Sequence, residues 1–227
     1  MQKRSKRYRK NAALVDAKKR YDVASAVAIL KKFEGMKFDQ TVDVSFALLL
    51  DVKKAEQAIR GAVSLPHGIG KSRKVVVFAE GADAEAAKGA GADEVGSDDL
   101  AKKVEGGWLD FDVAIAVPAM MKKISRLGKV LGPQGKMPSP KNGTVTENVT
   151  QAVREFKAGK IEYRADAGGN VMVAVGKISF PPEKLKDNVS FIVDHIRGVK
   201  PAGLKGNYFR KVVLSGTMTP GIALDVG

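Results

Sequence analysis

The 227-residue chain has no cysteine and two histidines, His67 and His195. Without cysteine there can be no disulfide, thiolate nucleophile or cysteine-based metal site, which suits a reducing compartment such as the cytoplasm. No nucleophile stands in a recognisable pattern with a base, and no group of metal-ligand residues occurs. The sequence therefore predicts a protein that is not an enzyme, with no catalytic residue, metal or cofactor, in which both histidines are structural.

Long apolar runs are absent as well. The longest ones, Val113–Met121 and Phe46–Leu50, are half a membrane span or less, and no apolar signal segment follows the basic N-terminus. We therefore expect no signal peptide and no membrane partner. The hydrophobic content of 44% is enough for two modest globular domains.

Positive charge is present in excess, but it is not spread evenly. The formal net charge is +14, yet residues 72–158 hold 13 Lys and Arg against 12 Asp and Glu, which leaves 26 against 13 for the two outer segments. Because the distant ends share one electrostatic character, we expect them to form one basic domain that carries a neutral domain as an insertion. The first predicted domain is discontinuous, comprises residues 1–69 and 159–227, and binds a polyanion. The second predicted domain is the insertion, residues 70–158.

The inserted segment alternates between strand and helix patterns. Apolar runs at 74–81 and 113–118 predict buried strands, and helix patterns cover 82–89, 99–105 and 147–158. The glycine- and proline-rich segment 131–143 predicts irregular structure. This alternation is typical of a Rossmann-like parallel α/β domain.

The outer segments predict an α+β two-layer domain. Helices are expected at 23–33 and 182–199, and strands at 41–51, 60–65 and 208–216. Residues 160–166 and 170–176 look like a hairpin joined through Gly168 and Gly169. The first ten residues hold six Lys and Arg and no acid, so we expect a mobile arm that an anionic ligand orders.

Two glycine motifs keep a second function open, namely a nucleotide-binding enzyme that uses the inserted domain. Gly68–Ser72 imitates the end of a phosphate-binding loop, but Leu65 stands where that motif needs its first glycine. Gly89 and Gly91 follow a predicted helix rather than a strand, and Glu94 replaces the third glycine of the dinucleotide motif. The alternative is therefore the weaker one.

Two short segments carry residues suited to RNA. Lys37–Thr41 places a lysine and Phe38 at the start of a strand, where the ring can pack on a ribose or base, unless Phe38 belongs to the core. Ser215–Pro220 ends the last strand with hydroxyl groups that can face a 2′-hydroxyl or a phosphate, unless the segment is only a turn.

Ordered motifs over residues 5–226 then give a resemblance. They are Lys6–Arg9, Lys37–Val42, Arg60-Gly61, Leu65–Gly68, Gly107–Asp112, Leu127–Pro138, Lys157–Arg164, Val175–Phe180 and Thr217-Met218. The sequence resembles the ribosomal protein L-one family of bacterial type, which is found on the mobile side stalk of the large ribosomal subunit. The resemblance implies that the discontinuous domain binds ribosomal RNA.

The residues of the implied RNA site lie in both outer segments. They are Lys37, Phe38, Thr41, Lys177, Ser179, Thr217 and Met218, joined by Lys6 and Arg7 of the basic arm. One departure from the family is Thr219, where glycine is usual after Thr-Met. We interpret the loop Gly132–Lys136 as structural, with a second ligand site as the alternative.

The resemblance also implies a role. It predicts a cytoplasmic protein of the ribosome, monomeric when free, that assists release of deacylated transfer RNA from the exit site and represses translation of its own messenger RNA. The implied partners are these RNAs and no small-molecule substrate. Because glycine tolerates large backbone rotations, we expect a hinge at the two chain crossings, formed by Pro66, Gly68, Gly70, Ala158 and Gly159.

Overall fold

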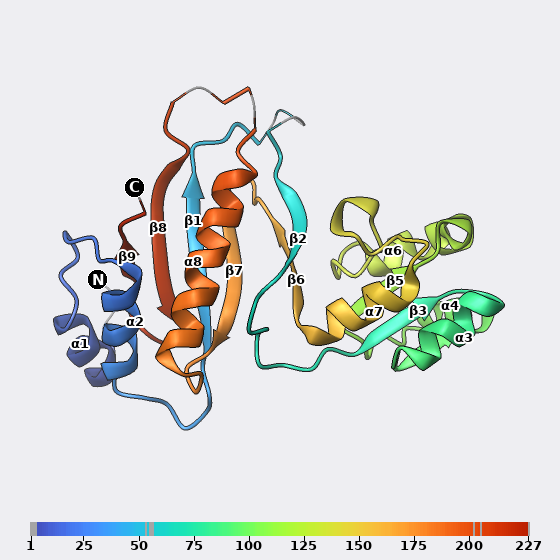
Figure 1. Ribbon diagram of the computed structural model, residues 1–227, viewed down its shortest axis with the longest axis horizontal. Coiled ribbons are helices and arrows are strands. Elements are labelled where there is room, and N and C mark those ends of the chain that lie inside the picture. Colours follow the sequence, from blue (N-terminus) through green and yellow to red (C-terminus); the bar gives the residue numbers. More distant parts are fainter. Residues whose placement is uncertain (1–3, 53, 55–56, 202, 205, 227) are drawn as a thin grey trace. The chain divides into compact units, whose positions relative to one another are not determined.

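The computed structural model of the protein describes residues 4–52, 54, 57–201, 203–204 and 206–226 (Figure 1). The chain divides into two compact units. The discontinuous unit comprises Met1–Arg60, Leu65–Gly70 and Tyr163–Gly227, and the inserted unit comprises Gly61–Ser64 and Lys71–Glu162. The predicted boundaries are 69/70 and 158/159, whereas the units divide after Arg60, Ser64, Gly70 and Glu162, so that Gly61–Ser64 are grouped with the inserted unit.

An antiparallel four-stranded sheet forms the centre of the discontinuous unit. Its order is β7-β1-β8-β9, with β7 at Asn170–Lys177, β1 at Thr41–Leu48, β8 at Phe209–Gly216 and β9 at Ile222–Leu224. In β1 every second residue is buried, which are Val42, Val44, Phe46 and Leu48. This alternation is typical of a sheet with one covered and one open face.

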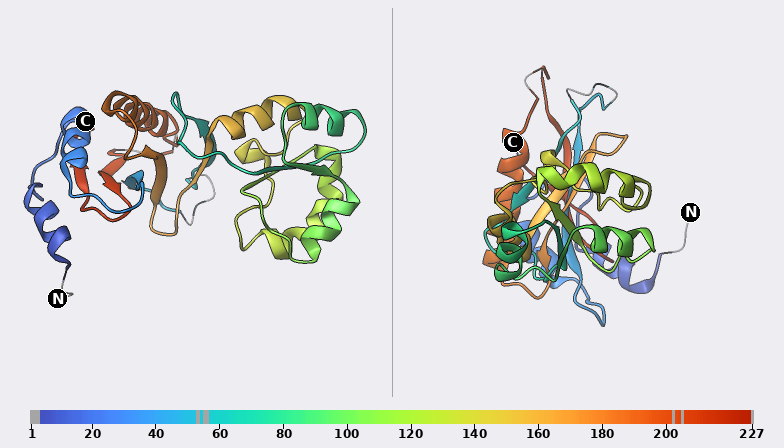
Figure 2. Two further views of the ribbon diagram at one scale, coloured as in Figure 1. Left: turned by 90° about the horizontal axis from the view of Figure 1, so that it is seen from below. Right: turned by 90° about the vertical axis from the view of Figure 1, so that its right-hand side faces the viewer.

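Two helices, α2 (Val23–Lys32) and α8 (Pro182–Gly198), cover the same face of this sheet (Figure 2). The Asp22 side chain begins α2 by accepting a hydrogen bond from the Ser25 N–H. The two helices bury apolar side chains at helical spacing: Ala26, Val27 and Leu30 from α2, and Leu185, Val189, Ile192 and Ile196 from α8. The unit is therefore the α+β two-layer domain expected from the sequence.

The predicted hairpin after residue 160 is wrong. A tight turn does form there, since the Asp166 carboxylate accepts hydrogen bonds from the N–H groups of Gly168 and Asn170. The flanking strands, however, enter different sheets: β6 (Lys160–Arg164) pairs with β2 (Arg60–Ser64), whereas β7 pairs with β1. Local pattern predicts a turn and two strands, but the partner of each strand depends on distant sequence.

The basic arm was expected to be mobile, but its described part from Arg4 onward contains a helix, and Met1–Lys3 lie outside the described residues. Residues Lys6–Ala13 form helix α1, which begins where the Ser5 hydroxyl accepts a hydrogen bond from the Tyr8 N–H. Asn11 is buried, donates to the Glu34 carbonyl at 3.3 Å and accepts from the Glu34 N–H at 2.9 Å. A helix cap and a buried amide thus order a segment whose charge alone suggested disorder.

The inserted unit has a parallel sheet of order β4-β3-β5, as predicted. Its strands are Glu94–Gly96, Val75–Phe78 and Val113–Ala116, and a parallel bridge from Ala116 to Val145 continues the sheet. All residues of β3 and β5 are buried, because helices cover both faces (Figure 2). One face packs on α4 (Asp98–Glu105), α5 (Met121–Ile124) and α6 (Gly128–Leu131), and the other on α3 (Ala82–Gly89) and α7 (Val149–Ala158).

The shortest elements were not predicted. These are β4, β9, α5, α6 and the 3₁₀ turns Pro118–Met120, Ser125–Leu127 and Pro140–Asn142. Three or four residues are too few for a periodic pattern to be recognised. Within the described residues, no helix combines the length and the apolar character that crossing a membrane requires.

Candidate nucleic-acid interface

Three chain segments meet at one end of the discontinuous unit's sheet. Because the strands are antiparallel, the start of β1 lies beside the ends of β7 and β8, so Thr41 is opposite Lys177 and Val42 is opposite Gly216. The Lys177 ammonium donates to the Thr41 hydroxyl at 2.9 Å, and the Thr41 N–H donates to the Thr217 hydroxyl at 3.1 Å. We call this region the strand-end surface; it comprises Phe38, Thr41, Lys177, Ser179, Thr217 and Met218.

Gln40 fixes the middle of the strand-end surface. Its side chain is 2% exposed, its backbone carbonyl accepts from the Ile178 N–H, and its Oε1 accepts from the Met218 N–H, each at 2.9 Å. The end of β7 and the turn after β8 are thereby tied to one buried residue. Sequence reasoning did not select Gln40, although a lone amide before an apolar strand was a usable signal.

Ser179 is held by Asp39. Its hydroxyl donates to one carboxylate oxygen of Asp39 at 2.7 Å and its N–H donates to the other at 3.1 Å. The hydroxyl proton is therefore used inside the protein, and its lone pairs remain for an external donor such as a ribose 2′-hydroxyl.

Two large apolar side chains project from this polar region. Phe38 and Met218 are each 48% exposed. The interpretation of Phe38 as a core residue is therefore wrong, and both side chains are free to pack on a ribose or base. Lys37, next to Phe38, is also exposed.

Helix α1 adds a cation beside Met218. One guanidinium nitrogen of Arg7, Nη2, donates to the Met218 carbonyl at 3.2 Å, while Nη1 is buried and has no hydrogen-bond partner in the described part of the chain. Arg7 and Thr217–Thr219 line a pocket of about 410 Å³ together with Arg4, Ser5 and Tyr8. Lys6 is exposed on the same helix, and within the described residues its side chain makes no hydrogen bond to the strand-end surface.

Lys31 is a second positioning residue that sequence reasoning missed. Its ammonium donates to the carbonyls of Ile178 and Phe180, on either side of Ser179. Burial lowers the pKa of Lys31, and the nearby charge of Asp39 opposes this shift. In the same region burial raises the pKa of Asp43, and the charge of Lys177 opposes that shift.

Thr219, which replaces the usual glycine of the resembled family, stabilises a turn. Its hydroxyl accepts from the Gly216 N–H at 2.8 Å, and its own N–H donates to the Gly216 carbonyl at 3.2 Å. No described residue other than glycine has positive φ, so the backbone at Thr219 is unstrained. Ser215–Pro220 is thus a turn that also presents Thr217 and Met218.

Both histidines make structural contacts. The His67 ring lies 3.1 Å from the Asp187 carboxylate, and the buried Asn188 donates to the carbonyls of Gly68 and Val175. These bonds hold the segment 65–70 on α8. The His195 ring nitrogen lies 3.0 Å from the Tyr163 hydroxyl, and burial lowers the pKa of His195.

The inserted unit offers little to a nucleotide. In a parallel α/β sheet such a ligand binds at the carboxyl ends of the strands. At that end of β3, Glu80 lies 2.6 Å from Lys123, which also pairs with Asp98 at 3.3 Å, so the lysine is already neutralised by two carboxylates. In the Gly132–Lys136 loop, the Lys136 ammonium donates to the Leu109 carbonyl at 2.9 Å, which suits the structural interpretation.

Known proteins match this chain over most of its length. The family model described as "Ribosomal protein L1p/L10e family" matches residues 30–220. The chain is 52% identical to the large ribosomal subunit protein uL1 of Salinispora tropica, with 97% of this chain and 93% of the relative covered. It is 53% identical to the uL1 of Fervidobacterium nodosum, covering 100% and 97%, and 51% identical to that of Lactiplantibacillus plantarum, covering 100% and 99%. The chain therefore belongs to the ribosomal protein L1p/L10e family and is of bacterial type.

Proposed function

We propose that the chain is a structural, non-enzymatic protein of the large ribosomal subunit whose discontinuous unit binds ribosomal RNA through the strand-end surface. The large-subunit relatives support the first part of this proposal. The observation that carries the second part is the exposure of Phe38 and Met218 beside Lys177, on a backbone that buried Gln40 holds in place.

Each residue of the surface has a chemical role in this proposal. Lys177, Lys37, Lys6 and Arg7 neutralise phosphates, and the hydrogen bond from Arg7 Nη2 to the Met218 carbonyl holds the Arg7 charge beside Met218. The Ser179 hydroxyl accepts from a ribose hydroxyl, while Phe38 and Met218 pack on exposed bases or riboses. Because Gln40 and Lys31 fix these groups before binding, less order has to be created in the complex.

The finer roles follow from family membership and stay proposals. On the cytoplasmic ribosome the protein assists release of deacylated transfer RNA from the exit site, and in excess it represses translation of its own messenger RNA. We propose that the protein is monomeric when it is not bound to the ribosome. Sedimentation of the free chain checks the monomer, and the rate of transfer RNA release from ribosomes lacking the chain checks the first role.

Hinge motion between the units is likewise proposed. Pro66, Gly68 and Gly70 belong to the discontinuous unit, with Gly68 held by Asn188, whereas Ala158 and Gly159 belong to the inserted unit at the end of α7. The units divide after Arg60, Ser64, Gly70 and Glu162, and we expect the rotation at the two predicted crossings, near Pro66–Gly70 and Ala158-Gly159. Distances between pairs of spin labels, one in each unit, should be broad in the free chain; one narrow distance in free and RNA-bound chain would contradict it.

The decisive test uses the two units separately. Residues 1–69 joined to 159–227 should bind large-subunit ribosomal RNA within about tenfold of the full chain, and residues 70–158 should bind it at least about a thousandfold more weakly, a difference of about 4 kcal/mol. Filter binding or calorimetry measures both. Tight binding by 70–158 alone would overturn the assignment.

A competition experiment tests the regulatory role. A fragment of the chain's own messenger RNA should displace ribosomal RNA, because the proposal gives both ligands the strand-end surface. A tenfold preference for ribosomal RNA, about 1.4 kcal/mol, already fills ribosomes before the message is repressed. A stable complex of one protein molecule with both RNAs would exclude a shared surface.

A further inference from the structure

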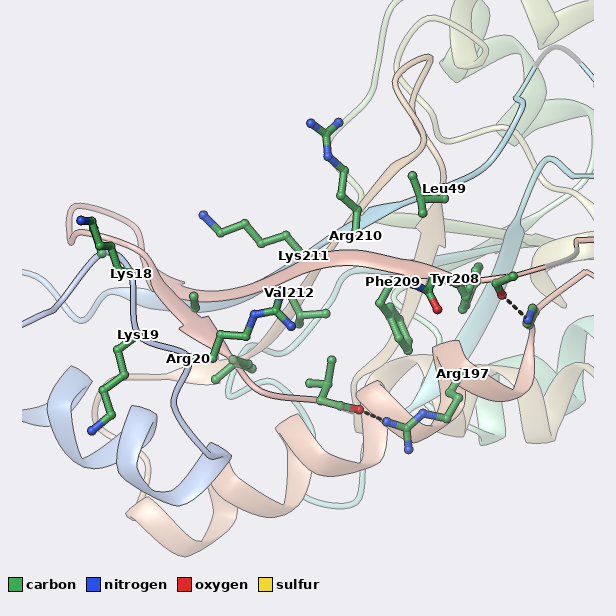
Figure 3. A pocket seen from close by; sticks show the side chains of 17 residues that line it. Lys18, Lys19, Arg20, Leu49, Arg197, Tyr208, Phe209, Arg210, Lys211 and Val212 are labelled. Carbon is green, nitrogen blue, oxygen red and sulfur yellow. Dashed lines mark hydrogen bonds between the residues drawn. The ribbon is translucent and has the colours of Figure 1, made fainter.

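A second basic region lies at the opposite end of β8 from the strand-end surface. It is a pocket of about 610 Å³ formed by the segment before α2, the end of α8, the start of β8 and the C-terminal strand (Figure 3). No Asp or Glu is among the described residues that line it. Its cationic residues, which define what we call the edge pocket, are Lys18, Lys19, Arg20, Arg197, Lys200, Arg210 and Lys211.

A β-bulge increases the density of charge at this pocket. Ala47 pairs with Lys211 and Leu48 with Phe209, so Arg210 is an extra residue of β8. In a regular strand Arg210 would share a face with Val212, which is buried. The bulge instead turns Arg210 outward beside Lys211, and Figure 3 shows both leaving the strand on the side opposite Phe209.

The same part of β8 has a free backbone edge. β9 pairs with Val212–Leu214 only, and in the described part of the chain Phe209–Lys211 have no strand partner on that side. Unpaired N–H groups at a strand edge are donors for an anionic ligand, as they are in many phosphate contacts.

Most of the pocket's charge is not neutralised by the protein. Among the described residues, Lys18, Lys19, Arg20, Arg210 and Lys211 form no ion pair with an acid. Figure 3 shows Arg20 reaching across the pocket toward Val212.

The remaining charged groups are engaged locally. Arg197 pairs with Asp194 at 3.4 Å and donates to the Val226 carbonyl, and Lys200 donates to the Gly206 carbonyl at 3.0 Å. Of the nearby acids, Asp16 accepts from the Lys18 N–H at 2.9 Å, and Asp225 is exposed. A concave surface with this surplus of positive charge attracts a polyanion.

The edge pocket is far enough from the strand-end surface to contact different nucleotides. β8 runs from Phe209 to Gly216, and at about 3.3 Å per residue its ends are about 23 Å apart. We propose that the edge pocket binds the phosphodiester backbone of a second RNA segment; this inference rests on the proposed function. RNA is favoured over an acidic protein segment because the exposed Leu49 lines the pocket together with Arg210 and Lys211, so that a base can lie on Leu49 while its phosphate contacts these cations.

The first test is the salt dependence of binding to large-subunit ribosomal RNA by the full chain. The variant Arg210→Gln with Lys211→Gln should lower the slope of log affinity against log salt by about two and weaken binding about tenfold at physiological salt. The matched control, Lys88→Gln with Lys102→Gln, removes two exposed lysines from the inserted unit and should leave the slope unchanged. Equal slopes for the two variants would overturn the inference.

The second test locates the RNA directly. Because the chain has no cysteine, Asn207→Cys at the edge pocket and Met36→Cys near Phe38 each give one exposed site for an iron chelate that cleaves nearby RNA. The two sites should cut different segments of the bound ribosomal RNA. Cuts from Met36→Cys only, or from both at the same nucleotides, would overturn the inference.

The outcomes separate this inference from the proposed function. If the unaltered chain binds ribosomal RNA no better than an unrelated RNA, the proposed function fails. If specific binding is intact but the Arg210 and Lys211 variant matches its control, only the edge pocket fails. The Arg210 and Lys211 variant could also bind RNA normally but be missing from assembled large subunits. That result would indicate a protein partner for the edge pocket and overturn the RNA assignment.

Discussion

The two units are similar in their use of α and β structure but differ in what their sheets leave exposed. In the inserted unit, β3 and β5 are buried along their whole length between two layers of helices. In the discontinuous unit, α2 and α8 cover one face, and β1 alternates between buried and partly exposed residues. The discontinuous unit also has 24 Lys and Arg against 12 Asp and Glu, whereas the inserted unit has 15 against 13.

The number of covered faces decides how much of each sheet is left to bind a ligand. A sheet covered on both faces has no surface left for a ligand except at its strand ends, and in the inserted unit one such end is occupied by Glu80, Lys123 and Asp98. A sheet covered on one face keeps strand ends and edges that can carry cations without burying them. Both candidate RNA contacts, the strand-end surface and the edge pocket, lie on this open sheet.

The largest expected effect comes from removing one core phenylalanine in each unit. Phe46 and Phe78 are both fully buried, so each Phe→Ala change should cost about 3–5 kcal/mol of folding free energy in its own unit. Phe78→Ala should shift the unfolding transition seen by Trp108, the one tryptophan of the chain, and leave RNA affinity within about twofold. Phe46→Ala should weaken RNA binding and leave the Trp108 transition in place. An equal shift of that transition in both variants would show that the units unfold together.

A smaller effect distinguishes a positioning hydroxyl from a phosphate contact. Thr217→Val leaves the Thr41 N–H without its acceptor, so specific binding to ribosomal RNA should fall by about 1–3 kcal/mol, while Thr217→Ser should retain it. Lys6→Ala should weaken binding of specific and random RNA equally, by less than Thr217→Val weakens specific binding. It should also reduce the slope of log affinity against log salt by about one. Titrations of each variant with both RNAs measure this. Equal losses for Thr217→Val on the two RNAs would place Thr217 outside the recognition surface.

The smallest effect is a pH dependence confined to the discontinuous unit. Burial lowers the pKa of His195 below its ordinary value of 6.5, so below pH 6.5 the unfolded chain binds a proton that the folded chain does not. His195 therefore contributes a loss of stability as the pH falls through this range, and none above it. His195→Gln, which can still accept from Tyr163, should remove this contribution. Denaturation followed by far-UV circular dichroism at pH 7.5 and below 6.5 measures it, and identical pH profiles for both proteins would contradict it.

Much of the fold follows from the sequence because it depends on local pattern. The alternating residues of β1, the continuously apolar β3 and β5, and the helical spacing in α2 and α8 each predict one element and the face that it buries. The uneven charge predicts which segments share a domain. Phe38, Thr41 and Thr217 were selected because family motifs mark them, and a hydrogen bond links Thr41 to Thr217 in the structure.

The partners of strands and of buried polar side chains were decided only by the tertiary structure, because they lie on distant segments of the chain. No local signal tells β7 to pair with β1 while β6 pairs with β2, since the register and partner of a strand are fixed by packing of the whole sheet. The same holds for buried Gln40 and Lys31, whose partners lie more than 100 residues away, and for the bulge at Arg210, which exists only relative to β1. The sequence by itself determined the elements, the charge and the family of this protein; folding determined which side chains meet, because burial and hydrogen-bond partners are properties of the assembled sheet and not of any single segment.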